Sequence, residues 1–503
     1  MAPDICTTSH FGRDDVLTTD DTPVYAINGN GTTTMKTTDD SNKPEADIAK
    51  PHDPNTSLIT PPANVFSPLA VAQPEPYQLL SYGLRLTDPH QQYWWEENGV
   101  SMGRLLERAG YPLHTQYKHL LLLHGSVLPW MGPAWPTTAT ATGDAAQPRT
   151  PGAALNYDGA PIEPSLNVTA SGLTVRFTIE PVGPAANRPG DQLNQAVGPA
   201  AVAAMGAAAG ADTRWARQLM AALFVSEAEA AALAGPGGRF AAMGARKPAL
   251  LVAYDLGRAG GVNMKTYFVP GYKAAATGRR ADGIVCDTVR GFAPGGAALA
   301  PAVDALEAYL AERGPAETSG LGVEMVAVDC RDPAEGAPRC KIYVRCMSNA
   351  FERVRDVYTL GGRKTDAETE EGLRRLRLVW HLLLDEREGV ADDRHKEHDG
   401  HHNAGLLFGM EVEADKPFPT PKVYVPLWHY CKTDKRMAEN LSEIFKMQGW
   451  GDIAESYGSD LQHFFPTHDI ANSSGTHTCV SYAYTEKKGV YTTLYYSPRS
   501  YGA

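Results

Sequence analysis

Three short segments of the sequence place a lysine two residues before a tyrosine within an otherwise apolar run. They are MKTYFVP at residues 264–270, CKIYVR at 340–345 and PKVYVP at 421–426. On a β-strand, residues two apart point to the same face, so each ammonium lies beside a phenol ring. The residue between them points to the opposite face. Such a strand face combines a group that binds anions with a π system that stabilises cations.

Other residues extend this pattern to further strand-like segments. Arg339 precedes Lys341 by two residues, and Arg176 lies within the alternating segment LTVRFTIEPV. In GVYTTLYY, Tyr491 and Tyr495 also share one face. A single strand of this kind is more often a solvent-exposed face. The repetition instead favours a closed antiparallel barrel with a polar, aromatic lumen and with helices packed outside it.

The chemistry that this lumen would support is the ionisation of an allylic diphosphate. Lysine and arginine are standard phosphate ligands, and tyrosine rings stabilise a carbocation by up to ~2 kcal/mol per contact when desolvated. The sequence has no P-loop, no G-x-G-x-x-G after a strand and no D-D-x-x-D motif for magnesium. We therefore expect side-chain cations to do the electrostatic work of a metal ion. The residues expected to converge on the diphosphate are Arg176, Lys265, Arg339 and Lys341.

The elements that must position these residues follow the repeated order helix, strand, strand, helix. Neighbouring strands with short connections indicate antiparallel pairing. Helical periodicity is expected at 91–110, 115–132, 213–224, 226–234, 301–314, 366–386 and 435–450. Strands are expected at 173–182, 248–256, 262–270, 324–330, 339–346, 405–413, 422–429, 476–486 and 489–498.

Composition, net charge and cysteine spacing indicate which classes of protein are excluded. Residues 1–75 are rich in Thr, Asp, Asn and Pro, which predicts a disordered extension before a barrel domain at 76–503. The formal charge of −12 argues against nucleic-acid binding, and no run approaches ~18 consecutive apolar residues. The seven cysteines are scattered, without disulfide or zinc spacing. We expect a cytoplasmic protein that binds neither membrane nor nucleic acid, and the sequence is compatible with a homodimer.

Longer segments carry a resemblance to a known family. They are LLERAGYPLHTQYKHLLLLHGSVLPWMGP, PIEPSLNVTASGLTVRFTIEPVG, YDLGRAGGVNMKTYFVPGYKAAATG, KIYVRCMSNAFERVRDVYTLGG, PKVYVPLWHY and HTCVSYAYTEKKGVYTTLYY. Together they resemble the fungal aromatic (indole) prenyltransferases of the dimethylallyltryptophan synthase family. The resemblance implies an α+β fold, a ten-stranded antiparallel β-barrel surrounded by α-helices known as the ABBA or PT barrel. It also implies metal-independent transfer of a dimethylallyl group from dimethylallyl diphosphate, with no cofactor.

The resemblance implies roles for individual residues. The implied diphosphate ligands are Arg176, Lys265, Arg339, Lys341 and Lys422, the last standing where some members carry Gln. The implied tyrosine shield around the carbocation is Tyr267, Tyr343, Tyr424, Tyr491 and Tyr495. Glu163, followed here by Pro164, matches the glutamate that accepts the indole N–H. Lys247 is the candidate base that removes the ring proton after attack.

The acceptor is left open by the sequence. An indole such as tryptophan, a tryptophan-containing cyclic dipeptide or an indole alkaloid is expected. A phenol or a polyketide is the alternative, because a glutamate binds a phenolic hydroxyl as readily as an N–H. A different class of function is a non-catalytic barrel that binds small molecules. The combined cation and tyrosine sets argue against it, since a carrier has no need of a cage for a carbocation.

Overall fold

The computed structural model describes residues 73–134, 153–184, 186, 191–234, 247–316, 320–335, 339–398, 400–401 and 403–500. These residues belong to one compact unit, Pro68–Ala503. The predicted disordered extension lies outside the described residues except for its last three, and the first helix begins at Glu75. Within the described ranges, no helix is long and apolar enough to cross a membrane.

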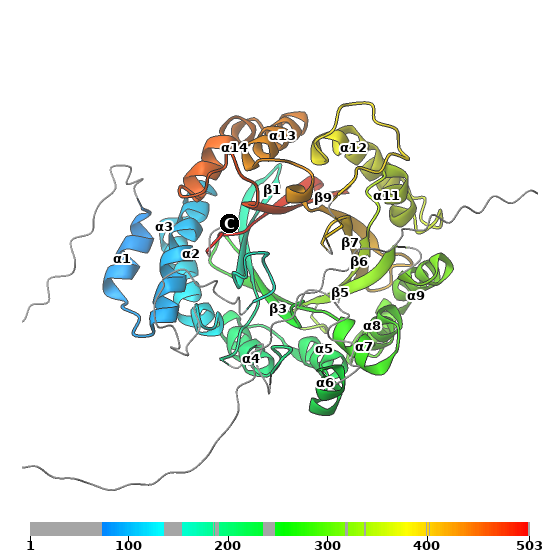
Figure 1. Cartoon of the computed structure of the whole chain (residues 1–503), viewed down its shortest axis with the longest axis horizontal. Helices are drawn as coiled ribbons and strands as arrows, with labels where there is room; N and C mark the ends of the chain where they lie inside the picture. The colour runs from blue at the N-terminus through cyan, green and yellow to red at the C-terminus, as the bar shows by residue number, and fades with distance from the viewer. Residues whose placement is uncertain are drawn as a thin grey trace, which may run out of the picture. The chain divides into compact units, whose positions relative to one another are not determined.

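Ten antiparallel strands close into one barrel, which confirms the predicted fold (Figure 1). Each strand pairs with the next one along the chain, and β10 pairs with β1 to close the ring. Because the ring is closed, every strand has a hydrogen-bonded neighbour on both sides. The strands are β1 (Ile162–Thr169), β2 (Gly172–Ile179), β3 (Leu250–Leu256), β4 (Val262–Phe268), β5 (Leu321–Asp329), β6 (Arg339–Cys346), β7 (Leu406–Glu413), β8 (Thr420–Val425), β9 (His477–Thr485) and β10 (Gly489–Tyr496).

Helices surround the barrel and connect successive hairpins, as the repeated helix-strand-strand-helix order predicts (Figure 1). The alanine-rich α4 was not expected from the sequence, because a helix that is apolar all round has no periodic stripe. The helices are α1 (Glu75–Gly83), α2 (Pro89–Arg108), α3 (Leu113–Leu122), α4 (Gly198–Ala209), α5 (Arg214–Leu223), α6 (Glu227–Ala234), α7 (Gly271–Thr277), α8 (Ala281–Arg290), α9 (Gly296–Arg313), α11 (Phe351–Tyr358), α12 (Ala367–Leu383), α13 (Asp434–Met447) and α14 (Gly451–Phe464). The short helical turns η1 (Leu123–Val127), η2 (Leu128–Trp130) and η4 (Leu427–His429) follow α3 and β8.

The apolar core lies between the outer face of the barrel and the helices. On β6, Cys340, Ile342 and Val344 are at most 1% exposed and belong to the same apolar cluster as Leu299 and Leu306 of α9. Fully burying a valine or isoleucine side chain stabilises a fold by roughly 1.5–3 kcal/mol. Because the outer face supplies the core, the alternate residues of each strand are free to be polar in the lumen.

Strand register arranges the lumen side chains in rows. Lys341 lies opposite Glu411 of β7, and Tyr343 lies opposite Gly409. A Cβ atom at position 409 would lie 3.3 Å from the ring of Tyr343 and 3.2 Å from that of Tyr424. Glycine therefore leaves the space that these two rings fill. One row of the lumen is charged and the adjacent row is aromatic.

Candidate active site

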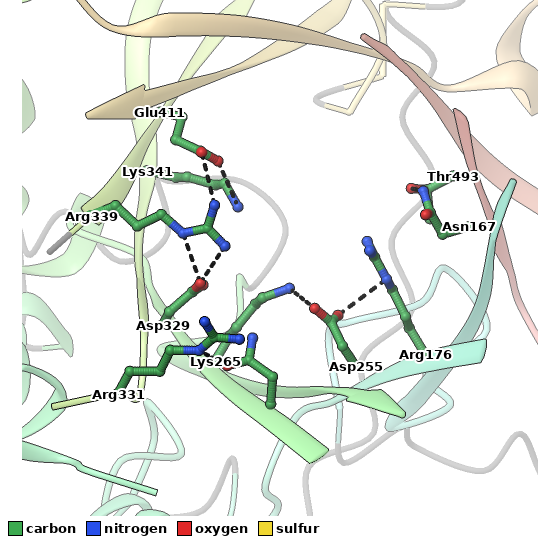
Figure 2. Close-up of polar contacts among 11 residues, drawn as sticks. Asn167, Arg176, Asp255, Lys265, Asp329, Arg331, Arg339, Lys341, Glu411 and Thr493 are labelled. Atoms are coloured by element: carbon green, nitrogen blue, oxygen red, sulfur yellow. Dashed lines mark hydrogen bonds and ion pairs between the residues drawn. The ribbon is translucent and has the colours of Figure 1, made fainter. Parts of the chain in front are cut away.

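Asp255 joins two of the predicted diphosphate ligands at one side of the lumen (Figure 2). Arg176 lies directly opposite Asp255 across the β2–β3 pair, with Nε 3.2 Å from Oδ1. Lys265 of β4 donates a hydrogen bond to the other carboxylate oxygen. Burial lowers the pKa of Lys265 to about 8, although Asp255 opposes this shift. Burial acts to raise the pKa of Asp255, but Lys265 and Arg176 together hold it below its usual value.

Arg339 and Lys341, the other two cations expected in the lumen, form a second group with two carboxylates. The guanidinium of Arg339 pairs with Asp329 at 2.6 Å and with Glu411 at 3.0 Å. Lys341 Nζ lies 3.1 Å from the second oxygen of Glu411. Lys341 and Arg339 lower the pKa of Glu411 to about 2, against the opposing effect of burial. The predicted cations thus lie together, and carboxylates hold them in fixed directions (Figure 2).

Lys422 differs from these four cations. Its Nζ lies 5.4 Å from the ring centre of Tyr424 and 5.0 Å from that of Tyr491. Within the described residues, no carboxylate is paired with it at 4 Å or less. Burial, together with the nearby charges of Arg176 and Lys341, lowers the pKa of Lys422 well below its usual range. An anion bound in the lumen would reverse that effect.

Four of the five predicted shield tyrosines form a continuous arc across the lumen. Ring centres are 6.0 Å apart for Tyr267–Tyr343, 5.8 Å for Tyr343–Tyr424 and 6.0 Å for Tyr424–Tyr495. Burial raises the pKa of all four phenols well above the usual value, so their hydroxyls stay protonated and can donate hydrogen bonds. Tyr491 stands apart from the arc, beside Lys422 and Lys488.

A cavity of about 230 Å³ opens on one side of this arc. All four tyrosines of the arc line it, together with Glu163, Lys247 and Trp428. A much smaller cavity, about 10 Å³, lies among Lys265, Arg339 and Lys341 and also touches Tyr267. Tyr267 therefore lies between a space among cations and a larger cavity whose lining is mostly aromatic and apolar.

Glu163 is partly buried, lines the larger cavity and has one side-chain hydrogen-bond donor among the described residues. Thr478 Oγ1 donates to Glu163 Oε1 at 2.7 Å. Burial raises the pKa of Glu163 to about 7, and the hydrogen bond from Thr478 partly counteracts this. The following residue, Pro164, fits the strand because the β1–β10 pairing begins only at Ser165, so the missing N–H leaves that pairing intact. A carboxyl group with this environment can accept a hydrogen bond from a ligand near neutral pH.

Lys247 lies just before β3 at the side of the same cavity, and it belongs to an ionic group that the sequence did not reveal. Its Nζ is 3.5 Å from Glu324, which also pairs with Arg345 at 2.6 Å. Arg345 and Lys247 lower the pKa of Glu324 to about 2, although burial acts in the opposite direction. Arg345 has the same strand parity as Lys341 and Tyr343, and this spacing was the signal that could have placed it in the lumen.

The sequence interpretation also missed the carboxylates and the hydroxyl that contact the predicted residues. Each carboxylate lies on a strand next to a cation-bearing strand, but a lone acidic residue in a strand has no recognisable spacing. The missed residues are Asp255, Asp329, Glu324, Glu411 and Thr478. Across the described chain, no group of three or more His, Cys, Asp or Glu side chains is arranged to hold a metal ion.

Comparisons with known proteins agree with this architecture. A model of the family described as tryptophan dimethylallyltransferase matches residues 90–460. A 7-dimethylallyltryptophan synthase of Aspergillus fumigatus is 34% identical over 446 residues, which cover 86% of this chain and 91% of the relative. The indole diterpene prenyltransferase terF of Tolypocladium album is 32% identical, with 81% of this chain and 93% of the relative covered.

Solved structures show the same barrel. AnaPT from Neosartorya fischeri superimposes with a TM-score of 0.71 at 25% identity, covering 84% of this chain and 97% of that protein. NotF in complex with brevianamide F and DMSPP superimposes with a TM-score of 0.69, covering 84% of this chain and 99% of NotF; at 23% identity this likeness concerns the fold. Since the family match spans most of the chain and relatives above 30% identity align along nearly all of their length, this protein belongs to the tryptophan dimethylallyltransferase family of prenyltransferases.

Proposed function

We propose that this prenyltransferase moves the dimethylallyl group of dimethylallyl diphosphate onto an indole ring without the help of a metal ion. One observation carries the proposal. Tyr267, one end of the tyrosine arc, borders both the small space among the cations and the larger cavity that Glu163 lines. An allylic cation formed between the two spaces would meet π faces on one side and an aromatic acceptor on the other.

In the first step, the bond between the allylic carbon and the diphosphate oxygen breaks, and the electron pair stays with the oxygen. The side chains proposed to stabilise that developing negative charge are Arg176, Lys265, Arg339, Lys341 and Lys422. Four of them are already oriented by carboxylates, so little reorganisation is needed as the bond breaks. Their number supports the proposal that no metal ion is needed.

In the second step, the π electrons of the indole attack the cation and the ring then loses a proton. Glu163, as a carboxylate, would accept the hydrogen bond of the indole N–H and raise the electron density of the ring. Lys247 lines the same cavity and remains the proposed base for the ring proton. Lys247 would accept that proton as a neutral amine.

Among the indole acceptors, the cavity favours one with a charged amino-acid group. Glu324 offers a carboxylate to an ammonium, whereas Arg345 and Lys247 offer cations to a carboxylate. The named activity of the A. fumigatus relative, 7-dimethylallyltryptophan synthase, points in the same direction. We therefore propose free tryptophan as the first acceptor to test.

The test is to incubate the purified protein with dimethylallyl diphosphate and, separately, tryptophan, a tryptophan-containing cyclic dipeptide or a simple phenol. Chromatography with mass detection would show a product one C5H8 unit heavier than its acceptor, formed fastest with tryptophan. Diphosphate release without any prenylated acceptor, or no reaction at all, would contradict the proposal.

Two substitutions separate the two steps. Lys341→Ala should lower turnover about 100-fold or more with every acceptor, because it removes a charge that stabilises the leaving group. Glu163→Ala should lower prenylation of indoles by a similar factor of about 100 but affect slow hydrolysis of the diphosphate much less. Equal rates for Lys341→Ala and the unchanged protein would rule out the cationic site.

A further inference from the structure

Strand β9 contains a bulge beside Glu163. Tyr495 of β10 pairs with Cys479, but the next residue, Tyr496, pairs with His477, so Thr478 is an extra residue on β9. Regular alternation from Cys479 would send Thr478 to the outer face. Instead Thr478 and Cys479 both line the cavity, and Thr478 reaches Glu163 at 2.7 Å. A bulge is a common way for a sheet to redirect one side chain.

Buried polar contacts hold the bulge from the helical side of the barrel. The carboxylate of Asp434, the first residue of α13, accepts hydrogen bonds from the backbone N–H groups of Thr476 and His477 at 2.9 and 2.8 Å. It also pairs with Nδ1 of His477 at 2.9 Å. His477 Nε2 contacts the hydroxyl of Tyr457 at 2.7 Å, and that hydroxyl lies 3.1 Å from the hydroxyl of Tyr496.

These contacts fix the side of the bulge that precedes Thr478. Asp434 and His477 are fully buried, and burial opposes the charge of Asp434, but the hydrogen bonds from His477 keep the pKa of Asp434 below its usual value. A buried carboxylate with three donors is a rigid anchor, because moving the strand would leave a charge uncompensated. The backbone before Thr478 is therefore held in place where the hydroxyl of Thr478 reaches Glu163.

We propose that Thr478 is a positioning residue, which the anchored bulge aims at Glu163 so that the carboxyl group stays ionised and oriented toward the acceptor. The inference rests on the proposed function only in assigning Glu163 to the acceptor. The hydroxyl donates a hydrogen bond to the carboxylate oxygen, and this favours the ionised form that can accept from an N–H group. The other oxygen of Glu163 is left for the ligand.

The charged and titratable groups around Glu163 do not duplicate this contact. Tyr495 of β10 and Cys479 of β9 lie near the carboxyl group, and the pKa of each is raised mainly by burial, so both stay neutral. The remaining charged groups of the cavity, Lys247, Glu324 and Arg345, pair with one another. The contact with Thr478 is thus the local interaction that favours the ionised form of Glu163.

The test compares Thr478→Val, Thr478→Ser and a matched control, Ser481→Ala, which removes a hydroxyl from the same strand. Infrared difference titration against Glu163→Gln reports the protonation midpoint of Glu163 in the free enzyme and needs no turnover. We expect the midpoint to rise by about one pH unit in Thr478→Val. It should stay at the original value in Thr478→Ser and in Ser481→Ala.

The pH profile of kcat/KM shows whether the ionisation of Glu163 controls activity. Its acidic limb should move to higher pH in Thr478→Val by the same amount and return in Thr478→Ser. An unchanged titration midpoint in Thr478→Val, or a uniform loss of activity at all pH values, would overturn the inference. If the midpoint moves but no variant prenylates any indole, the positioning role of Thr478 stands and the proposed function fails.

Discussion

Lys422 differs from the other proposed diphosphate ligands because no carboxylate among the described residues pairs with it. Of the five proposed diphosphate ligands, four have carboxylate partners, and Lys422 has none within the described part of the chain. It lies between two tyrosine rings in a buried, positively charged surrounding that lowers its pKa. Lys422 can therefore gain a proton when diphosphate binds.

Lys422→Gln should therefore change the pH dependence of anion binding. A bound diphosphate raises the pKa of Lys422, so between its free and bound pKa values binding takes up one proton. The affinity of the unchanged protein for pyrophosphate, relative to Lys422→Gln, should then fall by up to about tenfold per unit rise in pH across that range.

Calorimetry in buffers with different ionisation enthalpies measures this proton uptake. Pyrophosphate itself releases protons when it binds among cations, and the comparison with Lys422→Gln subtracts that contribution. The same proton uptake in both proteins would show that Lys422 does not change its charge on binding.

Among the elements, β9 contributes residues both to the apolar core and to the cavity. Its alternating pattern predicted the strand correctly, and Val480 and Tyr482 are buried against the helices as that pattern requires. The bulge at Thr478 could not be predicted, because it depends on pairing with β10 and on Asp434 about 40 residues earlier in the chain. The same limit hid the carboxylates of β3, β5 and β7, whose partners lie on neighbouring strands.

Asp434→Ala should destabilise the protein by about 3 kcal/mol or more, since it leaves a buried histidine and two backbone N–H groups without their acceptor. Denaturant unfolding followed by tryptophan fluorescence would measure the change. The exposed Asp452, in the first turn of α14, is the control, and Asp452→Ala should cost less than about 1 kcal/mol. Equal losses for the two variants would mean that the contacts of Asp434 do not anchor α13 to the barrel.

For the whole molecule, the sequence predicted the architecture because several strands repeat one pattern, with apolar residues on the outer face and cations or tyrosines in the lumen. Residues such as Ile342 and Val344 supply the core, and the lysine and tyrosine beside them face the lumen. The prediction of ten strands came from the family resemblance, and the closed ring confirms it. The pairing of Lys247, Glu324 and Arg345 could not be predicted from the sequence, because it joins a loop to two strands through tertiary contacts.

We propose that the protein's own cations replace a metal ion in ionising the diphosphate. The most direct measurement is the rate of tryptophan prenylation by chelator-treated protein, with dimethylallyl diphosphate and with EDTA present throughout. We expect the same rate with EDTA as with added magnesium, and a rate lowered in both conditions by Lys341→Ala. Product formation that stops in EDTA and returns only with a divalent cation would contradict it.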